Sequence, residues 1–84
     1  MSWTVFIKPS AKRDLERLPR SVVDRIDEKL LLLEETPFPS GARKLKGHDE
    51  YRIRVGDYRA VYQINHETNE IYVTRIAHRR EVYR

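Results

Sequence analysis

Residues 51–62 constrain the fold of this chain more than any other segment, because their side chains alternate strictly around a turn. Two runs of strand-forming residues flank the dipeptide Gly56-Asp57, which is typical of a two-residue hairpin turn. Alternation places tyrosines and small or aliphatic residues on one face of the hairpin: Tyr51, Ile53, Val55, Tyr58, Ala60 and Tyr62. The opposite face receives Arg52, Arg54, Arg59 and Val61. In this register Arg54 lies directly opposite Arg59.

The opposed pair Arg54 and Arg59 needs an explanation, since like charges directly across a sheet repel each other. One reading is an ordinary solvated sheet face, on which arginine is common. The other is a phosphate-binding face, because guanidinium presents a rigid fork of donors that matches phosphate oxygens. We adopt phosphate binding by this pair and Arg52 as the hypothesis, and we expect all three arginines to lie on the protein surface.

The length and composition limit the class of protein. A chain of 84 residues predicts a single domain over residues 1–84, with modest stability. It contains no cysteine, which excludes disulfides and thiolate zinc sites. Its longest purely apolar run, Leu30 to Leu33, is far shorter than a membrane span, and its first residues do not resemble a signal peptide. We therefore expect a soluble protein of the cytoplasm with no membrane partner.

The positive charge is concentrated in the second half of the chain. Residues 1–42 hold seven Lys or Arg and seven Asp or Glu, whereas residues 43–84 hold ten and six. The whole net charge of +4 therefore belongs to the second half. Such a positive field attracts anionic partners, of which nucleic acid and acidic protein are the leading candidates.

The order of predicted elements is strand, helix, helix and then three further strands. A strand over residues 3–7 precedes a first helix capped by Ser10, and a second helix with Pro19 in its first turn ends before residues 36–39. A polar, basic loop over residues 40–50 follows, within which a short strand around Leu45 is an alternative. The two strands of the hairpin, a turn at residues 66–69 and a strand over residues 70–77 complete the order. This order predicts an α+β fold with an N-terminal strand, a helical hairpin and an antiparallel β-meander. The helices then cover one sheet face and the arginines lie on the other.

We assign neither the tyrosines of the strands nor the two turns that contain histidine and acidic residues to a functional site. We interpret Tyr51, Tyr58, Tyr62 and Tyr72 as packing residues, because their phase agrees with that of Ile53, Val55 and Ile76. The stretches at residues 48–50 and 66–67 lack the convergent spacing of a zinc site, so we assign no metal and no cofactor. The chain also lacks a glycine-rich phosphate loop.

The tail, residues 76–84, is the second candidate for chemistry. The last strand is predicted to bring His78, Arg79 and Tyr83 beside the hairpin. Histidine exchanges a proton near neutral pH, arginine neutralises a developing charge, and tyrosine stacks on a base or donates a proton. The alternative is a basic terminus without a specific role.

Three segments together carry a resemblance to a known family. Residues 43–47, the hairpin at residues 51–62 and residues 77–83 strongly resemble RelE-type toxins of the RelE/ParE superfamily. The resemblance implies the RelE-like microbial ribonuclease fold and a toxin that inhibits translation by cutting messenger RNA in the ribosomal A site. It implies metal-independent cleavage, in which the ribose 2′-hydroxyl attacks the adjacent phosphate. It also implies two partners, the ribosome with its messenger RNA and a cognate RelB-like antitoxin in an oligomeric complex.

The resemblance extends to individual positions. It implies catalytic roles for Arg52, Arg54, Arg59, His78, Arg79 and Tyr83, and RNA binding by Arg43, Lys44, Lys46 and Arg80. The best-known RelE enzymes have lysines on the hairpin strand where this chain has Arg52 and Arg54. Because the pKa of arginine is too high for a general base, His78 becomes the candidate base and its role stays open.

Two alternatives to a RelE-type ribonuclease remain at this point. A ParE-like toxin poisons DNA gyrase by binding and cleaves no RNA, but such chains generally lack the full set of basic residues and tyrosine that Arg79 and Tyr83 complete here. A non-toxic binding module that keeps the same fold is the other alternative.

Overall fold

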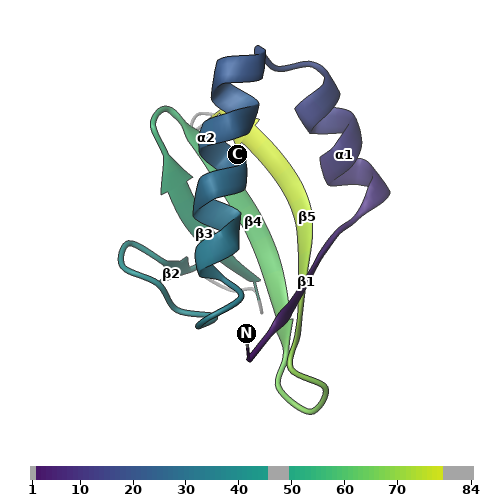
Figure 1. Ribbon diagram of the computed structural model, residues 1–84, viewed down its shortest axis with the longest axis vertical. Helices are drawn as coiled ribbons and strands as arrows, with labels where there is room; N and C mark the ends of the chain where they lie inside the picture. Colours follow the sequence, from purple (N-terminus) through teal and green to yellow (C-terminus); the bar gives the residue numbers. More distant parts are fainter. Residues whose placement is uncertain (1, 46–49, 79–84) are drawn as a thin grey trace.

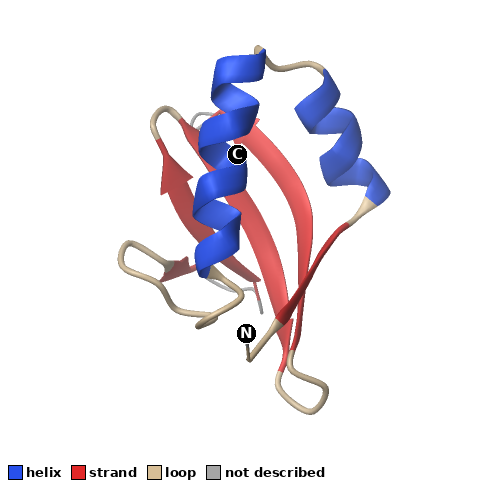
Figure 2. Ribbon diagram, in the orientation of Figure 1, coloured by secondary structure: helices blue, strands red, loops and turns tan. Residues whose placement is uncertain are grey.

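Two helices and a five-stranded sheet form the fold, as the computed structural model shows for residues 2–45 and 50–78. Both helices pack on one face of the sheet, and no helix of residues 2–45 and 50–78 lies on the other face (Figures 1 and 2). This arrangement confirms the predicted α+β fold. The elements are β1 (Thr4–Ile7), α1 (Pro9–Glu16), α2 (Arg20–Leu32), β2 (Arg43–Lys44), β3 (Glu50–Val55), β4 (Tyr58–Asn65) and β5 (Glu70–His78).

The sheet is mixed, with the strand order β1-β5-β4-β3-β2. Strands β2, β3, β4 and β5 pair antiparallel, as predicted for the meander. Strand β1 pairs parallel with β5, and Thr4 is the register partner of Glu70. The predicted meander did not include β1, and hydrophobic periodicity carries no information about the direction of this strand.

The helix starts differ from the predicted caps. Lys8 occupies the N-cap of α1 and Pro9 its first turn, where a missing backbone N–H is tolerated. The predicted cap, Ser10, instead donates its hydroxyl to the carbonyl oxygen of Thr74 at 2.6 Å, which ties α1 to β5. Helix α2 begins after Pro19, and its residues Ile26 and Leu30 are buried in the core.

A β-bulge divides β5 into two halves of opposite phase. Val61 of β4 faces Arg75, whereas the next residue of β4 faces Val73, so Thr74 is the extra residue. The side chains of Val73 and Ile76 therefore both face the helices, although they are three residues apart. Tyr72 consequently lies on the helix-free face, and its predicted phase with Ile76 was wrong.

Tyr62 fixes the loop after α2 to the sheet. It is fully buried in the core, and its hydroxyl donates to the carbonyl oxygen of Pro37 at 2.7 Å. Burial, together with the nearby Tyr51, raises the pKa of Tyr62 to about 12. The Tyr51 ring stacks on it with centroids 5.9 Å apart, which confirms both tyrosines as packing residues.

Candidate nucleic-acid interface

The helix-free face of the sheet, which we call the open face, carries its side chains in rows across the strands. The register defines a hairpin row of Arg54, Arg59 and Ala77, and next to it an arginine row of Arg43, Arg52, Val61 and Arg75. The third row, which we call the aromatic row, consists of Glu50, Gln63, Tyr72 and Phe6. Cations thus occupy two adjacent rows of one face, which gives it a positive field suited to an anionic polymer.

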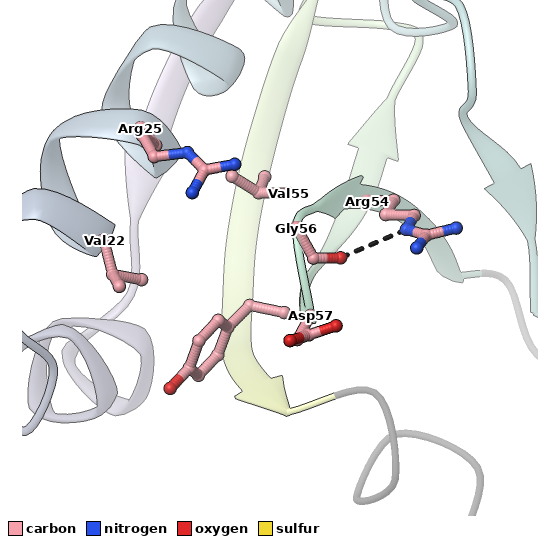
Figure 3. A pocket seen from close by; sticks show the side chains of 7 residues that line it. Val22, Arg25, Arg54, Val55, Gly56 and Asp57 are labelled. Atoms are coloured by element: carbon pink, nitrogen blue, oxygen red, sulfur yellow. Dashed lines mark hydrogen bonds between the residues drawn. The ribbon is translucent and has the colours of Figure 1, made fainter.

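The predicted hairpin register is confirmed. Val55 pairs with Tyr58, and Arg54 is the register partner of Arg59. The turn residue Gly56 has a φ of +61°, a conformation that glycine adopts without the penalty of a side chain. The Nε atom of Arg54 donates to the carbonyl oxygen of Gly56 at 3.1 Å, as Figure 3 shows, and this bond holds an exposed guanidinium at the tip of the hairpin.

Arg59 is buried, contrary to the expectation that it lies on the surface. Its residue is 7% exposed, and its flanking residues on the open face, Val61 and Ala77, are 4% exposed each. The Nη1 atom of Arg59 makes a long hydrogen bond of 3.4 Å to the carbonyl oxygen of Tyr58. Its Nε atom is buried and has no hydrogen-bond partner within residues 2–45 and 50–78. An unsatisfied donor on a buried cation is unfavourable in the protein alone, and an anion that accepts from it would remove the penalty.

His78 ends β5 beside the hairpin, but its side chain does not join the arginines. It is the register partner of Tyr58, and the two rings meet edge to face with centroids 5.6 Å apart. Tyr58 and its own partner Val55 belong to the face that α2 covers, where they line a pocket with Val22. His78 therefore lies on the opposite face of the sheet from Arg59, whose partner is the preceding residue of β5.

The basic residues before the hairpin divide between the two faces. Arg43 pairs with Arg52, so both belong to the arginine row. Lys44 pairs with Tyr51 and lies on the other face from Arg43, so these two residues of the predicted RNA-binding set are not brought together. The remaining predicted site residues lie outside the described residues: Lys46, Arg79, Arg80 and Tyr83.

A shallow pocket of about 390 Å³ lies between α2 and the hairpin tip (Figure 3). Arg25 of α2 reaches over the hairpin, and its Nη2 atom lies 3.4 Å from the position that a Cβ atom on Gly56 would take. Arg25 was not predicted as a site residue. Helical periodicity places it on a solvent-facing side, and only the packing of α2 against β3 brings it beside Gly56.

No metal centre and no membrane-spanning helix are found among residues 2–45 and 50–78. The His, Asp and Glu side chains of these ranges form no group of three that could hold a metal ion. No helix in the same ranges has the length and apolar character needed to cross a membrane.

Comparison with known proteins identifies the family. Residues 5–83 match the family described as ParE toxin of type II toxin-antitoxin system, parDE. The chain belongs to this toxin family. The toxin is similar to Toxin RelG of Mycobacterium tuberculosis, with 32% identity over 88 residues that span 100% of this chain and 99% of RelG. It is also similar to Toxin RelE3 of Methanocaldococcus jannaschii, with 34% identity over 79 residues and 84% of each chain.

Solved structures agree with the sequence comparisons. The toxin matches a chain in the crystal structure of the archaeal RelE-RelB complex from Pyrococcus horikoshii with a TM-score of 0.83 and 32% identity. The match covers 94% of the toxin and 97% of that chain. The resemblance to RelE-type toxins of the RelE/ParE superfamily is thereby confirmed, and the protein is a toxin of a type II toxin-antitoxin system.

Proposed function

We propose that this toxin is a ribosome-dependent endoribonuclease of the cytoplasm that cuts messenger RNA in the ribosomal A site. The observation that carries the proposal is the hairpin row, in which a buried guanidinium with an unsatisfied Nε lies opposite a second arginine. Phosphate is the anion whose oxygens match this fork of donors. The RelE and RelG names of the similar toxins support RNA as its source.

The proposed reaction is an internal transesterification. The ribose 2′-hydroxyl loses its proton to a base as its oxygen forms a bond to the adjacent phosphorus. The bond from phosphorus to the 5′-oxygen breaks and this oxygen takes up a proton, so the products are a 2′,3′-cyclic phosphate and a 5′-hydroxyl. Charge develops on the phosphate oxygens in the transition state, where Arg59 and Arg54 donate hydrogen bonds. The ribosome orients the strand so that the attacking and leaving oxygens are in line.

The remaining roles are those of the tail residues and of the base that takes the 2′-hydroxyl proton. Arg79 and Tyr83 take the roles that the family resemblance gives them, neutralising charge and positioning a base. His78 is the titratable candidate for the base, but its ring contacts Tyr58 on the face opposite Arg59. A base must come within hydrogen-bond reach of the 2′-hydroxyl, so the described orientation of His78 favours a packing role.

An antitoxin is the second proposed partner. The similar structures include toxin-antitoxin complexes, among them RelBE2 of Mycobacterium tuberculosis, with a TM-score of 0.82 and 26% identity. A RelB-like antitoxin with an acidic segment fits the positive open face, and a segment that orders on binding can cover a large surface. We propose that it covers part of the arginine row in an oligomeric complex.

Mapping of transcripts after induction tests the proposed activity. Induction of the toxin without an antitoxin should arrest growth, and primer extension should find cuts at ribosome-occupied codons. The Arg59→Met variant should leave the same transcripts intact. Growth arrest with uncut transcripts in the wild type would exclude the ribonuclease assignment.

A gyrase poison is the second candidate function, because the matching family is described as ParE toxin. Such a toxin acts by binding and needs no transition-state stabilisation. Induction would then leave transcripts intact and would change plasmid supercoiling or damage DNA. Measuring both effects in the same cultures separates the two functions.

A further inference from the structure

Two stacked aromatic rings lie on the open face, away from the hairpin row. Phe6 of β1 and Tyr72 of β5 are register partners, with ring centroids 5.3 Å apart and planes inclined by 16°. Phe6 is 41% exposed, whereas its chain neighbours Val5 and Ile7 pack against the core. Phe6 therefore presents a large apolar surface that the hydrophobic core does not use.

Charged neighbours orient the Tyr72 ring. The Nζ atom of Lys8 lies 5.5 Å from the centroid of this ring. The hydroxyl of Tyr72 donates to Glu70 Oε1 at 2.7 Å, and Thr68 donates to the same oxygen at 2.8 Å. The aromatic pair thus has a cation above one ring and a carboxylate at the hydroxyl end. Lys8 attracts a negatively charged RNA backbone to this part of the face, and Glu70 repels it from the hydroxyl end of the Tyr72 ring. The rings themselves are apolar and planar, so the RNA group that suits them is a base.

The aromatic pair is aligned with the arginines across the open face. On β4, Arg59 of the hairpin row and Gln63 of the aromatic row are four residues apart, which corresponds to ~13 Å at ~3.3 Å per residue. The arginine row, with Arg52 and Arg75, lies between them. A few nucleotides of extended strand cover this distance. Surfaces that bind single-stranded nucleic acid usually combine cationic side chains along the phosphate backbone with aromatic rings that stack on the bases.

We propose that Phe6 and Tyr72 form a stacking site for an unpaired base of the RNA strand whose scissile phosphate lies at Arg54 and Arg59. The inference rests on the proposed ribonuclease function and adds a second contact to its substrate, one that lengthens the bound RNA segment. Stacking is tolerant of base identity, since every base has a planar face, so the site contributes affinity rather than strict sequence selection.

Binding of short non-cleavable RNA tests this site. We would measure the affinity of 2′-O-methyl oligonucleotides of increasing length by fluorescence anisotropy at fixed salt, because these probes lack the attacking hydroxyl. In the wild type, affinity should rise by about 5- to 150-fold at the length that reaches the aromatic pair. Phe6→Leu should lose this step. Phe38→Leu, the same change at an aromatic residue that is 50% exposed and packs near Tyr51, should keep it.

Each outcome decides the inference. Phe6→Tyr retains a ring and should keep the step, which guards against a folding defect in Phe6→Leu. If Phe6→Leu keeps the rise in affinity with RNA length, the stacking site is overturned. The same holds if Phe6→Leu binds RNA normally but binds the antitoxin more weakly, because the rings would then belong to the antitoxin interface. Wild-type protein that cuts messenger RNA on ribosomes but shows no length step overturns the stacking site alone. Wild-type protein that neither cuts nor binds RNA overturns the proposed function with it.

Discussion

Replacing Arg59 with methionine should make the toxin more stable and less active. Methionine is unbranched and flexible, so it can fill most of the space of the arginine stem without a charge. Arg59 is 7% exposed and its buried Nε atom lacks a hydrogen-bond partner among the described residues, so the native side chain lowers the stability of the folded protein. Functional sites commonly carry such a stability cost.

The magnitude follows from the contacts of Arg59. Removing the unsatisfied buried donor should raise the unfolding free energy by ~1–3 kcal/mol, and removing the like charge opposite Arg54 should raise it by a further ~0.2–1 kcal/mol. Loss of the 3.4 Å hydrogen bond to Tyr58 and of guanidinium packing opposes these gains by ~0.5–1.5 kcal/mol. We expect the unfolding free energy to rise by about 1 kcal/mol, which raises Tm by about 4–8 °C in a domain of this size.

Arg43→Met is the matched control for stability. Arg43 lies opposite Arg52 as Arg59 lies opposite Arg54, but Arg43 is exposed. Its replacement should change the unfolding free energy by no more than ~0.5 kcal/mol. Thermal unfolding followed by circular dichroism measures both variants at the same salt concentration.

Two further measurements complete the test of Arg59. Sulfate should raise the Tm of the wild type more than chloride does at equal ionic strength, because it binds the folded site and is also excluded from the protein surface. Arg59→Met should reduce this difference to the part that exclusion alone produces, which the Arg43→Met control measures. Single-turnover cleavage on programmed ribosomes should fall ~100- to 1,000-fold in the variant. A large drop in the Tm of Arg59→Met, together with an unchanged sulfate effect, would show that Arg59 serves the fold and would refute the reasoning.

Three other predictions use contacts described above. Tyr62→Phe should lower the unfolding free energy at neutral pH by ~1–3 kcal/mol, because the Pro37 carbonyl loses its donor. The pKa of Tyr62 is raised from 10.0 to about 12, so its stabilising effect is complete below pH 10 and is lost as the pH rises to about 12; urea titrations over this range should show a steeper alkaline loss in the wild type than in Tyr62→Phe. His78→Ala should retain the wild-type pH–rate profile, since the ring contacts Tyr58 and not the arginine pair; a flattened acidic limb would instead restore His78 as the base. Antitoxin affinity should fall as salt rises, because the open face is basic, and calorimetry that finds equal affinity at low and high salt would exclude binding through the arginine row.

The hairpin was predictable because its information is local. Alternation and the Gly56-Asp57 turn determine both the register and the pairing of Arg54 with Arg59. The burial of Arg59 was not predictable, because it arises only in the assembled sheet, where β4 lies between β3 and β5. Only the assembled sheet brings Arg54, Arg59 and Ala77 into one row.

The bulge explains why the aromatic pair was missed. An unbroken alternation along β5 assigns Tyr72 to the same face as Ile76, and one extra residue at Thr74 reverses this assignment. No turn residue such as glycine marks the position in the sequence. The bulge is held by tertiary contacts, namely the Thr74 hydroxyl bond to the Val61 carbonyl and the bond that Ser10 makes to the Thr74 carbonyl.

The parallel pairing of β1 with β5 links the earliest described strand to the latest. Because Thr4 pairs with Glu70, β1 has no strand neighbour until residues beyond Asn65 have been synthesised. Strand β5 also supplies Ala77 beside Arg59 and carries the Tyr72 ring. The catalytic surface proposed for this toxin therefore cannot assemble on a partly synthesised chain. If the toxin acts on ribosomes as proposed, the ribosome that makes it can finish translating these elements before the product is able to act.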